Sequence, residues 1–548
     1  MSTLRFIAKF ALISLFCYNM VMLKRLKDWF KNHKTLVAFV VTGLFVLVQV
    51  PFILNHETLN SEATAWELSK EINPGNIYDK NSAEPYPFLF EVILAPFSQN
   101  NFPVITMSII ALVFVAIAVF LFVRFAPMGF LVKLIFLLSS AFFYFNPTIA
   151  RGYCLIPLSI CLICLAYEKR HKKPLLYGLS LAFLAQTDFL MYGLLVVLFV
   201  GFIIEEIRSK NNAKKTFKTL LLFLFPTLIS IALTIPIIIG AFLNNLILNG
   251  GLFKNSEVAL SLFPSFQLAF FGVNEVIVNI LTIVLAIIII LGFLARNFKV
   301  TIYSIVSLGF WFFIFSVLYP NYSNLDQKSS LLVLILLAIT WIFYKEKEVK
   351  NEIISKFFNL FEIVKFLKKH LKYPVVVPIC ILVFANIPNT FAEAFNDLNG
   401  ELNNVKDVSK FINNLEGKTL IIEGDTIPYN DLFTPSVRAN IENKNVSFYN
   451  ALLKSYDDYG YHLSYNEASM KVFDDVAEKV DSSEITEFFE NSKKEYDHIY
   501  YLTGVYIRSC DEKLYIEDYL MDYPIIRDFN NKEYLRSQLR TVLVYKIK

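Results

Sequence analysis

The sequence has few charged residues and few glycines for its length. Charged residues make up 18% of the 548 residues, whereas soluble domains average about 25%. There are 18 glycines against 54 phenylalanines, hydrophobic residues make up 55%, and the mean hydropathy is +0.51. This composition excludes a soluble enzyme, a disordered chain and a nucleic-acid-binding protein. It indicates a chain that lies largely in a lipid bilayer.

Cysteine is also scarce, which excludes a disulfide scaffold. Six cysteines are present, and of these only Cys510 lies in the polar C-terminal part, so that part has no intrachain disulfide. Cys161 and Cys164 have CxxC spacing, but they lie within an apolar segment. We interpret them as small apolar residues of a membrane helix.

Long apolar segments are abundant, and each of about 20 residues is a candidate membrane helix. The eleven main candidates are about 35–54, 103–123, 130–147, 149–166, 175–190, 191–206, 219–243, 275–295, 300–319, 330–344 and 373–390. The sequence therefore predicts a mainly α-helical, polytopic membrane protein with about eleven transmembrane helices. A further apolar run at 6–22 has four alternative interpretations. It is an extra span, an interfacial helix, a signal-like segment, or the result of a start codon assigned upstream of the true one.

The charges between these segments predict their sidedness. Basic clusters precede the first span and follow the fourth, sixth, eighth and tenth, so alternating spans place them all on one side. By the positive-inside rule this side is cytoplasmic. We expect a plasma-membrane protein with a cytoplasmic N terminus and, after an odd number of spans, an extracytoplasmic C-terminal part.

The chain divides into three parts on this basis. Residues 1–34 form an N-terminal cytoplasmic or interfacial segment, and residues 35–390 form the membrane module with a long outer loop at 55–102. Residues 391–548 carry a net charge of −10 against +14 for the rest of the chain. In this last part strands at 418–424, 446–450, 497–503 and 539–547 alternate with helices at 401–415, 482–494 and 511–522, which predicts an extracytoplasmic α/β domain.

Ionisable residues gather on the predicted outer face, where charges near the membrane usually mark a function. A short helix begins near Asn60 or Ser61, either of which can cap it, and Pro74-Gly75 ends it. Its first turn holds Glu62, and a capping carboxylate on a solvated helix is the alternative interpretation of that residue. The other candidates on this face are Asp79, Arg151, Tyr153, Asp188 and Lys254.

Three segments within residues 35–200 resemble the GT-C class of membrane glycosyltransferases, which use polyprenyl-phosphate sugars, and in particular its bacterial mannosyltransferase and aminoarabinose-transferase members. The first is Asn60-Ser-Glu62-Ala followed by Tyr86-Pro-Phe-Leu, the second is Asn146-Pro-Thr-Ile-Ala-Arg151-Gly-Tyr153, and the third is Lys173-Pro-Leu-Leu-Tyr-Gly with Gln186-Thr-Asp188. The chain departs from the family where Ser61 replaces one acid of a common pair, where Phe88 replaces a proline and where Asp188 replaces a histidine.

The resemblance implies transfer of a sugar from a polyprenyl-phosphate donor to a glycan, lipid or protein acceptor on the outer face, with inversion at the anomeric carbon. It implies Glu62 as general base. Arg151 and Lys254 would bind the donor phosphate. Asp79, Asp188 and Tyr153 would bind sugar or acceptor. No metal ligand is assigned, and a divalent cation stays open.

Two other functions fit a chain of this kind. A transporter or flippase of lipid-linked glycans would carry charges near mid-membrane, often at broken helices, whereas the charges here lie at outer helix ends. A non-catalytic scaffold with an outer binding domain would be insensitive to replacement of Glu62.

Overall fold

The structure is a computed structural model. It describes residues 32–56, 58–75, 77–80, 86–209, 212–248, 275–294, 297–318, 325–346, 376–399, 405–423, 434–450, 455–456, 482–505, 524–530 and 541–548. The run at 6–22, Lys254 and the predicted helix at 511–522 lie outside these residues.

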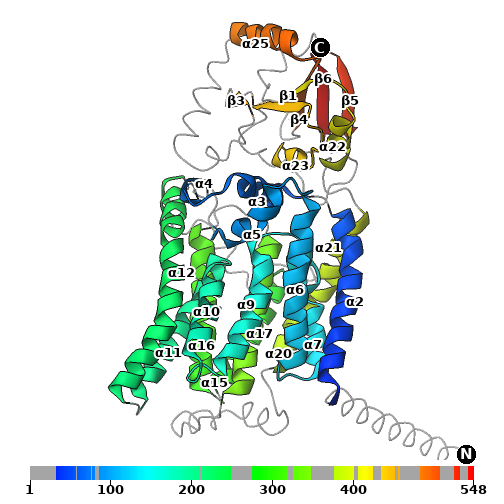
Figure 1. Cartoon of the computed structure of the whole chain (residues 1–548). Coiled ribbons are helices and arrows are strands. Elements are labelled where there is room, and N and C mark those ends of the chain that lie inside the picture. Colours follow the sequence, from blue (N-terminus) through cyan, green and yellow to red (C-terminus); the bar gives the residue numbers. More distant parts are fainter. Residues whose placement is uncertain are drawn as a thin grey trace, which may run out of the picture.

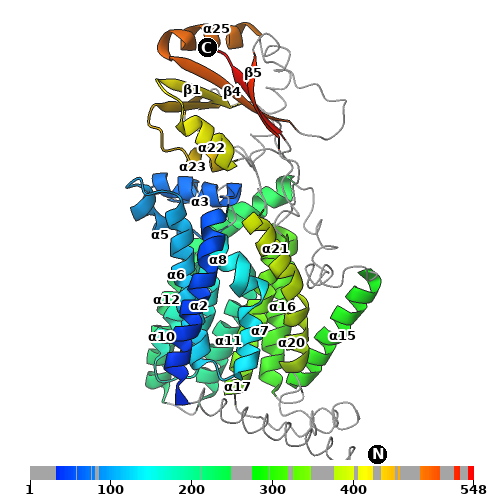
Figure 2. The ribbon, with the colours of Figure 1, turned by 90° about the vertical axis from the view of Figure 1, so that its right-hand side faces the viewer.

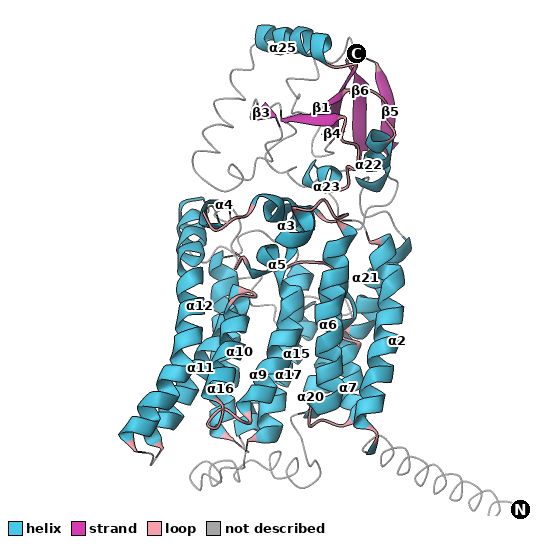
Figure 3. Cartoon of the chain, in the orientation of Figure 1, coloured by secondary structure: helices cyan, strands magenta, loops and turns pink. Residues whose placement is uncertain are grey.

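The described chain is mostly helical, with a helix bundle at one end and a smaller sheet-containing domain at the other (Figures 1 and 3). A helix is found at each of the eleven apolar segments. The bundle helices are α2 (Lys34–Asn55), α6 (Ile105–Phe125), α7 (Phe130–Leu137), α8 (Asn146–Thr148), α9 (Ile156–Tyr167), α10 (Pro174–Ala185), α11 (Tyr192–Arg208), α12 (Ala213–Leu248), α15 (Glu275–Leu294), α16 (Phe298–Leu318), α17 (Leu325–Lys345), α20 (Val376–Ala385) and α21 (Ile387–Asn399).

Five helices among the described residues are long and apolar enough to cross a membrane. They are Lys34–Asn55, Ile105–Phe125, Phe189–Arg208, Ala213–Gly240 and Val376–Leu398. A sixth candidate is a pair, Phe130–Leu137 and Ala141–Thr148, bent by 59°. Part of this pair is the π-helical segment η2 (Ala141–Phe145). Shorter apolar helices, of 10–17 residues, include Gly152–Tyr167 and Pro174–Ala185.

Packing inside the bundle is close, and its outer surface is apolar. A Cβ atom at Gly193 of α11 would lie 2.7 Å from the carbonyl oxygen of Ser307 on α16, so only glycine allows these two helices to approach as they do. Leu47 and Phe217, by contrast, are each 68% exposed. On α15, whose upper end diverges from its neighbours in Figure 2, Ile280 and Ile283 are exposed as well. A surface of this kind fits a lipid environment.

Three short helices lie across the end of the bundle that faces the sheet domain: α3 (Asn60–Glu71), α4 (Ile77–Lys80) and α5 (Leu89–Ser98) (Figure 1). The α3 helix packs against α5 and against α23 (Thr434–Ala439) of the sheet domain. As a result every residue from Glu62 to Ser69 is buried. The predicted helix after residue 60 is therefore present, but it is enclosed rather than solvated.

The C-terminal domain contains a six-stranded sheet in the order β3-β2-β1-β4-β6-β5, in which β1 runs parallel to both β2 and β4. The strands are β1 (Thr419–Glu423), β2 (Val446–Asn450), β3 (Ser455–Tyr456), β4 (His498–Val505), β5 (Ile525–Asn530) and β6 (Thr541–Lys546). Ile421 packs in the cluster with α22 (Val405–Asn413) and α23. Leu420 and Ile422 pack with α25 (Ser482–Glu495) on the other face. Because both faces of the strand are covered, it appears in the sequence as a short continuous apolar run.

Candidate functional site: a buried carboxylate and histidine cluster

Glu62 lies at the start of α3 and is fully buried. The N-cap residue, directly before the helix, is Leu59, whose side chain makes no capping hydrogen bond, so neither Asn60 nor Ser61 is the cap. Instead, the Leu59 backbone N–H donates to Glu62 Oε2 over 2.8 Å. The helix ends at Glu71, before Pro74. Glu62 thus caps the helix, but its other contacts go well beyond a capping role.

His56 lies between Glu62 and a second buried carboxylate. Its Nε2 is 2.8 Å from Glu62 Oε2, and its Nδ1 is 2.7 Å from Asp397 Oδ2. The three side chains are between 1% and 3% exposed. An ionised carboxylate only accepts hydrogen bonds, so both ring nitrogens donate when both acids are ionised, and His56 is then an imidazolium. Burial by itself lowers the pKa of His56, but Glu62 and Asp397 outweigh it and raise this pKa well above its usual value.

Asp397 brings a distant part of the chain to this cluster. It lies on α21, 341 residues after His56, and Tyr144 of η2 also donates its hydroxyl to Asp397 Oδ2 at 3.0 Å. The other oxygen, Oδ1, is buried and has no hydrogen-bond partner among the described residues. The cluster therefore joins α2, α3, η2 and the helix that leads toward the C-terminal domain.

A hydrogen bond connects Glu62 to the segment that contains Arg151. The backbone N–H of Ala150 donates to Glu62 Oε1 over 2.6 Å. Arg151 follows directly, is only 6% exposed, and its guanidinium carbon lies 4.6 Å from the ring centre of Tyr86 and 5.9 Å from that of Tyr153. Two of the predicted residues, Arg151 and Tyr153, thus lie against each other and beside the segment that contacts Glu62.

The loop with Asp188 meets the same region from another side. A Cβ at Gly152 would lie 3.2 Å from the Thr187 carbonyl oxygen and 3.9 Å from Cβ of Phe90 on α5. Asp188 is fully buried, and its Oδ1 accepts from the backbone N–H of Leu190 at 2.7 Å, which caps the short helix η4 (Phe189–Met191). The contacts of Gly152 therefore join the Arg151 loop, α5 and the Asp188 corner.

For the two other predicted residues, Asp79 and Lys254, no side-chain contact is described. Asp79 lies on the short helix α4. Lys254 lies outside the described residues. Within the part of the chain that the structure describes, no group of three or more His, Cys, Asp or Glu side chains is arranged to hold a metal ion.

Sequence reasoning missed His56 and Asp397. His56 had a detectable signal, because it directly follows a 22-residue apolar helix and precedes Glu62 by six residues. Asp397 had none, because only the fold brings α21 beside α2.

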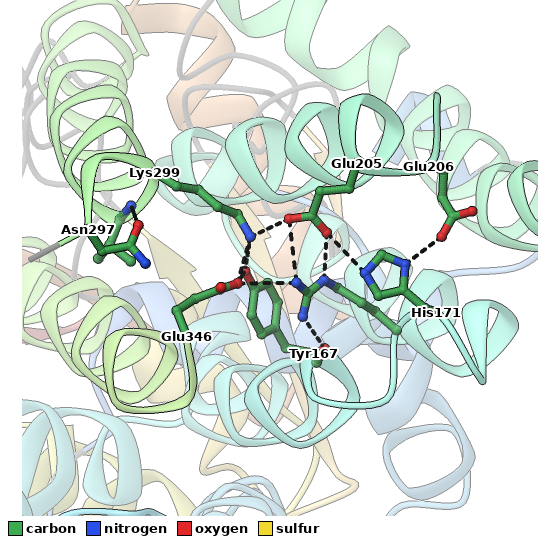
Figure 4. A network of polar contacts seen from close by, with 9 residues as sticks. Tyr167, His171, Glu205, Glu206, Asn297, Lys299 and Glu346 are labelled. Carbon is green, nitrogen blue, oxygen red and sulfur yellow. Dashed lines mark hydrogen bonds and ion pairs between the residues drawn. The ribbon is translucent and has the colours of Figure 1, made fainter. Parts of the chain in front are cut away.

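A second polar network lies at the opposite end of the bundle (Figure 4). Arg170 Nε donates to Glu205 Oε2 at 2.8 Å, and Lys299 Nζ donates to Glu346 Oε1 at 2.6 Å and also contacts Glu205. His171 lies between Glu205 and Glu206. The ends of α9, α11, α16 and α17 meet here, so these predicted same-side segments do lie together.

The comparisons add no relative. Neither a family model, nor a curated protein, nor a solved structure matches the chain. A function for this chain is therefore proposed from its residues and their geometry.

Proposed function

We propose that this protein is a GT-C-type membrane glycosyltransferase that moves a sugar from a polyprenyl-phosphate donor to an acceptor on the outer face of the membrane. One observation carries the proposal: the hydrogen bond from the Ala150 N–H to Glu62 Oε1. It brings a carboxylate of the first long loop into contact with the residue that precedes Arg151, although 88 residues separate Glu62 and Ala150. The proposed general base thus contacts the backbone of the segment that carries the proposed phosphate ligand.

The acid is suited to accept a proton. A carboxylate has about four acceptor positions, and three N–H groups occupy three of them, from His56, Leu59 and Ala150. Among the described residues, one position on Oε1 is left for an acceptor hydroxyl. In the proposed reaction this hydroxyl oxygen attacks the anomeric carbon, and its proton passes to Glu62. The bond to the donor phosphate breaks, and the phosphate oxygen leaves with the electron pair.

Arg151 would stabilise the leaving phosphate. Its planar guanidinium suits phosphate oxygens, and its stacking on Tyr86 fixes the direction in which it points. Lys254 is the second proposed phosphate ligand, and Asp79, Asp188 and Tyr153 are the proposed sugar or acceptor ligands. A single displacement inverts the anomeric centre, so equal anomeric configurations in donor and product would contradict this mechanism.

The proposed sidedness has support in the bundle. Lys299, labelled in Figure 4, lies near the start of α16, and α17 ends at Lys345, beside Glu346, which pairs with Arg170. These two helix ends lie opposite α3 and the sheet domain (Figure 1). We infer that this end is cytoplasmic, that about eleven segments cross the plasma membrane, and that the site and the α/β domain are extracytoplasmic.

The test is sugar transfer from a labelled polyprenyl-phosphate donor in membranes that contain the wild type or Glu62→Gln. The substitution keeps the shape and removes the base, so transfer should fall at least about a hundredfold. Glu67→Gln is the matched control, because Glu67 lies on the same helix, is 1% exposed and pairs with Lys70 rather than with His56. Equal transfer by wild type and Glu62→Gln would rule out Glu62 as the base.

A second candidate function has one observation in its favour. The bent pair at 130–148 is a broken helix, which is typical of transporters. The polar residues at the bend are neutral and bonded: Gln49 donates to the Phe143 carbonyl at 2.8 Å, and Asn146 to that of Ala141 at 2.6 Å. A flippase would move a fluorescent lipid-linked glycan across a liposome membrane without sugar transfer and regardless of Glu62→Gln.

A further inference from the structure

Two separate contacts attach the C-terminal part of the chain to the region around Glu62. The first is the hydrogen bond between His56 Nδ1 and Oδ2 of Asp397, which lies on α21. The second is the packing of α23 on α3, in which Ala439 joins the buried core of the bundle. Asp397 lies near the C-terminal end of the last candidate span, Val376–Leu398, and the chain continues from there into the sheet domain. A displacement of α21 would therefore act on His56 before it acts on Glu62.

His56 lies between the two carboxylates, so a displacement of Asp397 changes the contact that His56 makes with Glu62. Each ring nitrogen contacts one carboxylate, and three titratable groups surround the ring. These are Glu62 from α3, Asp397 from α21 and, through Asp397, Tyr144 from η2. All three are buried, so water cannot replace a lost partner at low cost. Glu62 and Asp397 therefore both favour the protonated ring, which can donate one hydrogen bond to each carboxylate.

We propose that His56 and Asp397 are positioning residues for Glu62, and that through them α21 sets how the Glu62 carboxylate is oriented for proton transfer. His56 donates to Oε2, and the acceptor position left open is on Oε1. This pair of residues, His56 and Asp397, is called the relay below. It orients the Glu62 carboxylate without occupying the acceptor position on Oε1. This role in catalysis rests on the proposed glycosyltransferase function, whereas the physical coupling of α21 to Glu62 does not.

The experiment compares full-length wild type, Asp397→Asn, His56→Gln and a matched control, Glu393→Gln. Glu393 lies one turn before Asp397 on the same helix and is half-buried. The first measurement is the pH dependence of transfer at saturating acceptor. Asp397→Asn should lower kcat about tenfold with little change in KM. It should also move the alkaline limb about one pH unit lower, because the imidazolium loses the acid that favours it.

His56→Gln should remove the alkaline limb. The glutamine can still donate a hydrogen bond but has no proton to lose, so nothing at this position titrates as the pH rises. A residue with a merely structural role would reduce the amount of active protein without moving either limb. If one variant does not accumulate in the membrane, the other still tests the relay.

The second measurement is amide hydrogen exchange of the purified proteins in detergent, which needs no substrate. The amides of Leu59 and Ala150 donate to Glu62, so Asp397→Asn and His56→Gln should speed their exchange about tenfold, and Glu393→Gln should not. Faster exchange without any sugar transfer by the wild type would contradict the glycosyltransferase function and uphold the coupling. Transfer and exchange that are alike in Asp397→Asn and Glu393→Gln would overturn the relay.

Discussion

His56 and His171 each lie between two carboxylates, but at opposite ends of the bundle and in different surroundings. The side chain of His56 is 3% exposed, and that of His171 is 47% exposed. Near His171, Arg170 and Lys299 also neutralise Glu205, and Glu206 contacts the ring as a second acid. Among the described residues, no lysine or arginine forms an ion pair with Glu62 or Asp397. We therefore expect the histidine to be essential for neutralising the carboxylates around His56 and replaceable in the cluster around His171.

Burial explains this difference. Solvent-exposed ion pairs contribute about 0.2 to 1 kcal/mol, because water solvates both partners when the pair is broken. A buried pair from which one partner is removed leaves a charge that water cannot reach, at a cost of about 3 to 5 kcal/mol. Replacing each histidine in turn measures this contrast within one protein.

The largest effect is expected for His56→Leu. Two buried carboxylates would then face each other without a cation, and the free energy of unfolding should fall by about 3 to 5 kcal/mol. Thermal unfolding in detergent, followed by tryptophan fluorescence, would measure this as a large drop in Tm. A Tm equal to that of His171→Leu would contradict the contrast between the two ends.

The pH dependence of stability should come mainly from His56. Its pKa in the folded protein lies well above its usual value of 6.5. Its contribution is therefore complete below about pH 6.5 and is lost as the pH rises through the raised folded pKa, at no more than about 1.4 kcal/mol per pH unit. Tm should fall from neutral to alkaline pH in the wild type, and this fall should be much smaller in His56→Gln. An unchanged slope in the variant would assign the effect to other groups.

A smaller effect is expected for Lys299→Met at the opposite end. Glu205 and Glu346 would each lose one cation but keep Arg170, and Lys299 is 28% exposed, so the loss should be about 1 kcal/mol. A double-mutant cycle of Lys299→Met with Glu346→Gln would isolate the pair. A coupling as large as that between His56 and Asp397 would show that this network, too, depends on burial.

The smallest effect is expected for His171→Gln. The Glu205 hydrogen bond raises the pKa of His171, with a further contribution from Glu206, but water reaches the ring, so unfolding should change by no more than about 0.5 kcal/mol. The same unfolding measurement should show a Tm close to that of the wild type. A drop comparable to that of His56→Leu would mean that exposure does not govern the strength of these clusters.

Local patterns made parts of this structure predictable. Long apolar runs predicted the bundle helices, and a short apolar run at 418–424 predicted a strand, whose two faces pack on different helices. Other features depend on contacts that no local pattern contains. The strand β5 has a register shift between Ile525 and Arg527, and β3 has only two residues, so neither has a usable period. The pairing of Asp397 with His56 arises only when the last span packs beside the first.

In the Glu62 region, too, some residues could be predicted from local sequence, whereas their surroundings depend on distant contacts. Glu62 and Arg151 were predicted to act together, and a hydrogen bond now joins Glu62 to the residue before Arg151. The catalytic roles of both residues stay predictions. The burial of the helix that carries Glu62 could not be predicted, because α3 packs against α23, which carries no strong sequence signal and lies more than 360 residues after α3.

The π-helical segment η2 limits where insertions and deletions can be accepted in this chain. A π-helical turn is equivalent to one residue inserted into an α-helix, and η2 carries both Tyr144, which contacts Asp397, and the Phe143 carbonyl, which accepts from Gln49. A deletion of one residue from 141–145 that restored regular α-helical winding would remove the wide turn that presents the Tyr144 hydroxyl to Asp397 and the Phe143 carbonyl to Gln49. Insertions and deletions should therefore be tolerated in the loops of this protein but not in these five residues.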